Sequence, residues 1–193
     1  MKGYIKLRRH LLHILQTEIP DHYSYHGMSH TMNVLKVCNQ YIRREKVTSE
    51  EAKLLRIGAL CHDIGFIVSN QNHEEESIVL AASLMTHYGF SDAHISIVKG
   101  LIQATRVPQN PKTSLEKLLC DADLDYLGRD DYYEISNKLY QELKTFKLIS
   151  NKEEWKQQQI NFLKAHRYHT QFARKNRQPA KENRIKELSN RPN

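Results

Sequence analysis

Apolar residues recur at helical spacing along almost the whole chain, and few residues interrupt them. In residues 4–19, for example, Leu7, Leu11 and Ile14 fall on one helical face before Pro20 ends the pattern. The 193 residues include only seven glycines and five prolines, about half of the usual share of these turn-forming residues. No stretch alternates convincingly with a period of two. The sequence therefore predicts an all-α fold, a single helical bundle.

Residues that commonly begin helices divide this pattern into eight segments. Thr48 and Glu51 have the spacing of a capping box, in which each side chain bonds to the other's backbone N–H. Gly65 is the expected terminator of the helix that this box begins. Together the signals predict helices that start near Tyr4, Ser29, Thr48, Asn72, Ser91, Ser114, Asp130 and Asn151.

Composition excludes several classes of protein. No apolar run approaches the roughly 18 residues of a membrane-spanning helix, and the N-terminus lacks the apolar core and cleavage site of a secretory signal. Cys38, Cys61 and Cys120 are odd in number and show no paired spacing, so we expect buried, reduced thiols. These features predict a cytoplasmic protein without a membrane partner.

The positive charge of the chain is concentrated at its end. Residues 164–193 contain nine lysines or arginines and two acids, which equals the net charge of +7 of the whole chain. The sequence therefore predicts a folded domain over residues 1–166 and a basic extension over residues 167–193.

Within the extension, Pro179 is expected to interrupt any longer helix, which leaves a short one over residues 181–188 held by Ile185 and Leu188. A shortened chain that ends near Gln178 is then expected to keep most of the turnover of the full chain on a small substrate. No aromatic stacking platform accompanies the basic residues, so specific nucleic-acid binding is disfavoured.

Two acidic residues and two histidines stand beside core-facing helical stripes. His62 and Asp63 end the apolar segment GALCHDIGF, and burying such a pair is costly unless its charge is compensated. Imidazole and carboxylate together suit divalent Mn, Fe, Ni, Co or Zn. His30 and Asp123 begin and end two other predicted helices, and helical bundles build metal sites from side chains that converge in this way.

These segments resemble the HD-domain metal-dependent phosphohydrolases. The resemblance covers roughly residues 22–128 and includes HTMNV, CHDIG, HEEESIVLAASLM and DADLDYLG. It implies an all-α HD-type domain that hydrolyses phosphate esters with one or two divalent metal ions. The residues that match the metal ligands of the family are His30, His62, Asp63 and Asp123.

The resemblance also separates a one-metal from a two-metal site. His73 matches a histidine that binds the second ion in two-metal members, but Thr105 and Arg106 stand where those members have another histidine. We therefore expect one divalent ion. Mg is a candidate for it beside Mn, Fe, Ni, Co and Zn. His73 and Glu74 are then candidates for catalytic proton transfer, and His26 and Arg106 for binding phosphate oxygens.

The leading hypothesis is a phosphohydrolase that cleaves a small phosphomonoester, with a nucleotide as the favoured substrate, by metal-activated water. One alternative is a non-catalytic HD-type protein that binds nucleotides or nucleic acid. Another is a two-iron oxidative enzyme on the same scaffold, against which the absent histidine counts. The sequence leaves a homo-oligomer open.

Overall fold

The computed structural model describes residues 1–190, in which helices are joined by loops and turns and no strand occurs. Within these residues, ten α-helices and two short 3-10 helices, η1 and η2, follow one another. Their bounds are α1 Tyr4–Thr17, α2 Met28–Arg44, α3 Ser49–Cys61, η1 Ile64–Ile67, α4 His73–His87, α5 Asp92–Thr105, α6 Ser114–Asp123, η2 Asp125–Gly128, α7 Tyr132–Thr145, α8 Lys152–Ala165, α9 Gln171–Asn176 and α10 Gln178–Asn190. The all-α prediction is confirmed.

Several helices begin where capping chemistry predicts. The Thr48–Glu51 capping box is formed at the start of α3, with Thr48 Oγ1 accepting from the N–H of Glu51. The side chains of Ser91 and Asn151 cap α5 and α8 in the same manner. Each of these bonds satisfies an N–H group that has no partner inside the helix.

Three predicted caps are wrong. Asn72 precedes α4 in a left-handed conformation, with φ of 56°, and its side chain makes no capping bond. The residue that caps α6 is Thr113 rather than Ser114, and it forms a capping box with Glu116. Ser29 lies inside the first turn of α2, which begins at Met28 after Gly27, and no side chain caps this helix. All three helices nevertheless begin within one residue of the predicted position.

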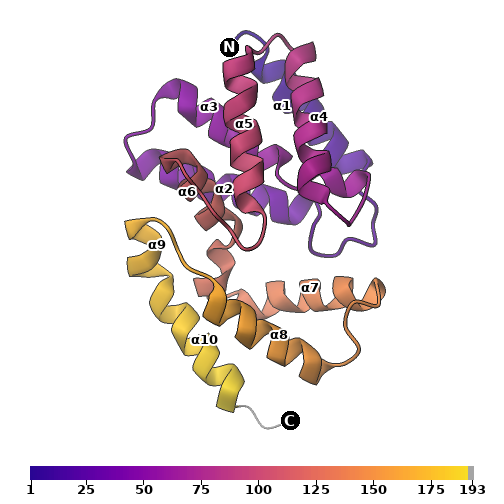
Figure 1. Cartoon of the computed structure of the whole chain (residues 1–193), viewed down its shortest axis with the longest axis vertical. Coiled ribbons are helices and arrows are strands. Elements are labelled where there is room, and N and C mark those ends of the chain that lie inside the picture. The colour runs from indigo at the N-terminus through magenta and orange to yellow at the C-terminus, as the bar shows by residue number, and fades with distance from the viewer. Residues whose placement is uncertain (191–193) are drawn as a thin grey trace.

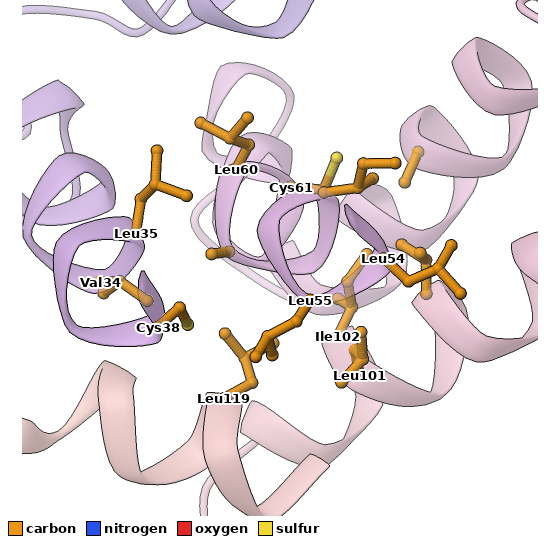
Figure 2. Close-up of a cluster of buried hydrophobic side chains, with 14 of the residues drawn as sticks. Val34, Leu35, Cys38, Leu54, Leu55, Leu60, Cys61, Leu101, Ile102 and Leu119 are labelled. Carbon is orange, nitrogen blue, oxygen red and sulfur yellow. The ribbon is translucent and has the colours of Figure 1, made fainter. Parts of the chain in front are cut away.

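The larger hydrophobic cluster is built around α3 and joins α1 to α6. Residues 54, 55 and 57–61 of this helix are all buried, so α3 is surrounded by other helices rather than lying at the surface. Figure 2 shows Leu54 and Leu55 beside Leu101 of α5, and Val34 and Cys38 on the neighbouring α2. The three cysteines are free and buried. The helix that carries His62 at its end is thus the most enclosed of the fold.

A second cluster is formed by η2 and the helices that follow it. Figure 1 shows α7, α8, α9 and α10 gathered below the first six helices. Tyr132 of α7 is 2% exposed, Leu163 of α8 is 1% exposed and Leu188 of α10 is 3% exposed. Residues 167–190 are therefore packed into the second cluster.

The helix at the end of the chain is longer than predicted. It begins at Gln178, so Pro179 lies in its first turn, where a missing N–H breaks no helical hydrogen bond. Lys181, 1% exposed, donates a hydrogen bond of 2.7 Å to the carbonyl of His166. The expected boundary at residue 166 stays a prediction, and residues 191–193 lie outside the described range.

In residues 1–190, no helix has both the length and the apolar character that crossing a membrane requires.

We predict that Leu188→Ala lowers the free energy of unfolding by about 2–4 kcal/mol, because it leaves a cavity in the second cluster. Lys186→Ala is the matched control, since Lys186 is an exposed residue of the same helix. Urea denaturation followed by circular dichroism measures both variants. Equal stability of the two variants would mean that α10 contributes no core.

Candidate metal centre

The structure brings the four predicted ligands together at one point. His30 comes from the first turn of α2, His62 and Asp63 follow α3 directly, and Asp123 is the last residue of α6. The Nε2 atoms of His30 and His62 are 3.2 Å apart. His30 Nε2 lies 3.3 Å from Asp63 Oδ2 and 3.1 Å from Asp123 Oδ1, and His62 Nε2 lies 3.1 Å from Asp63 Oδ2. Ligand atoms of four side chains from three helices thus share one small volume.

His62 and Asp63 can both face this point because α3 ends directly before them, at Cys61. Neighbouring residues of a continuous helix point about 100° apart. Asp63 leaves the helical conformation, with φ of −112° and ψ of 7°, and this turns its carboxylate toward His62.

The tautomer of the neutral His62 ring is set by the backbone of its own helix. Its Nδ1 lies 2.9 Å from the carbonyl oxygen of Ala59, an acceptor, so Nδ1 carries the hydrogen. In the neutral ring, Nε2 therefore presents a lone pair to the cluster. A hydrogen bond that fixes the tautomer in this way is the usual support of a metal-binding histidine.

Both carboxylates of the cluster are ionised. Burial works against the charged form of Asp63, but the charge of His62 and hydrogen bonds from both histidines outweigh it and hold the pKa well below the usual value. The same balance lowers the pKa of Asp123 to about 2. Burial likewise opposes the charged imidazoles, whereas Asp63 and Asp123 raise the pKa of His30 and, more strongly, that of His62. Positive charge between the two carboxylates, carried by a proton or a cation, therefore stabilises the cluster.

The donor set fits a divalent metal ion. Metal–ligand bonds of about 2.1 Å at right angles separate neighbouring ligand atoms by about 3.0 Å, close to the spacing found here. Without a cation, the facing Nε2 atoms of His30 and His62 are compatible only when one of them carries a proton. His30, His62 and Asp123 form the group whose ligand atoms all lie within 4.8 Å of one another, and Asp63 joins it through its distances to the two imidazoles.

His73 and Glu74 lie beside the cluster at the start of α4. His73 Nε2 is 3.6 Å from Asp63 Oδ1, the carboxylate oxygen that does not face His30, and 3.5 Å from Glu74 Oε1. The His73 ring stacks on Phe66 with a centroid distance of 4.1 Å. Burial lowers the pKa of His73, against the opposing charges of Asp63 and Glu74. Both predicted catalytic residues line the cleft that Asp63 and Asp123 of the cluster also line.

His26 is held by Glu142, which the sequence analysis did not identify. Glu142, 3% exposed, bonds to His26 Nδ1 and accepts hydrogen bonds from the backbone N–H groups of Tyr25 (2.8 Å) and His26 (3.0 Å). Phe66 stacks on the His26 ring at 4.3 Å. One signal was present: Glu142 lies on the apolar stripe of α7, where a carboxylate requires a partner.

The remaining predicted residue, Arg106, lies apart from the cluster. Its guanidinium bonds to Glu75, and it lines a separate depression with Gly100 and Glu116. A phosphate contact from Arg106 stays a prediction and requires this ion pair to open. Thr105 does line the main cleft, and its hydroxyl donates to the carbonyl of Ile102.

Asp121 and Asp125, on either side of Asp123, bond to the end of the chain. Asp121 accepts hydrogen bonds from the N–H groups of His169 (2.8 Å) and Thr170 (2.7 Å), and Arg177 Nε donates to Asp125 at 2.7 Å. Both aspartates are at most 1% exposed. These bonds fix the backbone on both sides of Asp123.

Gly65 is needed where α4 passes η1. A Cβ at this position would lie 2.0 Å from the carbonyl oxygen of His73 and 2.7 Å from the backbone nitrogen of Ser77. The Gly65 N–H donates to Ser77 Oγ at 2.8 Å. The expected role as helix terminator is corrected, because α3 already ends at Cys61; the absent side chain instead lets α4 bring His73 toward Asp63.

Comparison with known proteins gives one match. A family model described as HD domain matches residues 27–125, just over half of the chain. This segment contains all four residues of the cluster and ends before α7. Neither the curated proteins nor the solved structures that were searched gave a significant match.

We predict that Gly65→Ala destabilises the protein by about 3 kcal/mol, because the new methyl group meets backbone atoms that cannot move aside. Gly100→Ala is the control, since its Cβ would meet only the flexible side chain of Glu116, at 3.1 Å. Thermal and urea unfolding compare the two. A Gly65→Ala protein as stable as Gly100→Ala would show that the close approach of α4 is not required.

Proposed function

Because the chain belongs to the HD-domain family, we propose that it is a metal-dependent phosphohydrolase that cleaves a small phosphomonoester. The observation that carries this proposal is the convergence of His30, His62 and Asp123, with Asp63 Oδ2 close to both imidazoles. In the reaction, water adds to phosphorus, the ester P–O bond breaks, and an alcohol and inorganic phosphate leave.

The four side chains of the cluster would hold the divalent ion. When bound, the ion polarises a phosphoryl oxygen and makes water a stronger nucleophile near neutral pH. Asp63 and Asp123 supply the negative charge that retains it, and the Ala59 carbonyl keeps His62 Nε2 directed at it.

His73 and Glu74 are proposed to move the proton that the attacking water loses. His73 Nε2 lies between the carboxylates of Asp63 and Glu74, at 3.6 and 3.5 Å. A ring so placed can take a proton at Nε2 and pass it to Glu74 or to solvent in the cleft. Phe66 restricts the ring by stacking on it.

His26 is proposed to contact the phosphate through Nε2. Its Nδ1 is occupied by Glu142, so Nε2 is the atom left for a ligand. His26 lines the cleft together with His73 and Asp63. A nucleotide stays the favoured substrate, and a cytoplasmic location stays a prediction.

We predict that Asp63→Ala loses both bound metal and phosphate release, while helix content remains near that of the unchanged protein. Asp21→Ala, which alters an exposed aspartate outside the cleft, is the control. Metal analysis measures the bound ion, and a phosphate-release assay measures turnover. Unchanged turnover in Asp63→Ala would contradict the proposal.

We also predict one tightly held ion per chain, because Thr105 offers no imidazole for a second site. His73→Ala should then keep the ion and lose turnover by about 100-fold or more, as expected when a proton-transfer group is removed. Elemental analysis of both proteins decides the point. Two ions, one of which is lost with His73, would instead indicate a two-metal centre.

A further inference from the structure

The cleft at the metal centre extends along an apolar wall that the HD-domain match does not include. The cleft measures about 590 Å³, enough for a ligand much larger than phosphate. Away from the cluster it is lined by Leu139 and Leu143 of α7 and by Trp155 and Phe162 of α8. All four are only partly buried, so they offer apolar surface to a ligand.

The polar groups along this wall are uncharged. Gln158 and Asn161 are exposed residues of α8 that contribute amide groups to the lining. Amides donate and accept hydrogen bonds without favouring a charged partner. This part of the cleft thus suits a ring with polar atoms at its edge.

The charges of the cleft discriminate against additional phosphates. Asp63, Glu74 and Asp123 are its carboxylates, and His26 and His73 are its other ionisable side chains apart from tyrosines. Among the described residues that line it, none is a lysine or an arginine. Within this cleft, a second or third phosphate would lie against apolar side chains and near carboxylates, without a cation among the lining residues.

We infer that the substrate is a phosphomonoester with a single phosphate and an uncharged, ring-containing organic group. The phosphate would lie at the metal centre, and the ring against Trp155 and Phe162. This inference rests on the proposed function for its phosphate end. Trp155 already stacks on Tyr140 and Phe162 on His166, and both are partly exposed, so a bound ring would extend an aromatic surface and bury the part that faces the cleft.

A binding experiment tests the ring site without turnover. Trp155 is the sole tryptophan of the chain, so intrinsic fluorescence reports on this wall. Phenyl phosphate and adenosine monophosphate should change the emission of the full-length protein in a saturable manner, whereas glycerol 3-phosphate at equal concentration should not. Equal responses to all three would overturn the inference.

Kinetics of Trp155 variants provide the second test. Trp155→Ala should raise KM for phenyl phosphate about tenfold, the size of one aromatic contact, and leave KM for glycerol 3-phosphate unchanged. Trp155→Phe should restore most of the difference, which separates loss of the ring contact from loss of folding. An equal change in KM for both substrates, or a preference for adenosine triphosphate over the monophosphate, would overturn the inference.

The two proposals fail in different ways. If the metal-loaded protein releases phosphate from none of these esters, the proposed function is wrong, whatever the fluorescence shows. If it releases phosphate from all of them with similar kcat/KM, the function holds and the ring site is wrong.

Discussion

Two ionised carboxylates buried beside two imidazoles impose the main constraint on this structure. Asp63 and Asp123 are drawn into the interior at the ends of α3 and α6, where ionised groups are stable only if positive charge faces them. The helices cannot separate these groups, because α3 is enclosed by the other helices of the first cluster. A divalent ion at this position would neutralise both carboxylates and accept the lone pairs of both histidines, which is the explanation that we propose for burying these four side chains together.

The second cluster of helices completes this centre from outside the matched segment. Asp121 and Asp125 bond to residues 169–177 and thereby fix the backbone around Asp123. Glu142 of α7 reaches back across the chain to hold His26. The same helices, α7 and α8, also supply the apolar wall of the cleft. Residues after 125 therefore shape both the His/Asp cluster and the space that a substrate would occupy.

The sequence predicted the parts of the structure that depend on local chemistry. Helical periodicity and caps such as Thr48 located most helices, and the four cluster residues were identified because the HD-type motifs place them at helix ends. Contacts between distant segments could not be predicted in this way. Glu142 meets His26 across 116 residues, and the need for glycine at position 65 arises only when α4 packs against η1. Pro179 was misjudged because its effect depends on its place in the helix.

Anomalous diffraction from crystals of the protein loaded with Mn, Fe or Zn would test the metal centre most directly. A single peak is expected about 2.0–2.3 Å from Nε2 of His30 and of His62 and from one carboxylate oxygen each of Asp63 and Asp123. A bound ion that lies elsewhere on the chain, or that leaves either aspartate without contact, would contradict the assignment of these four residues.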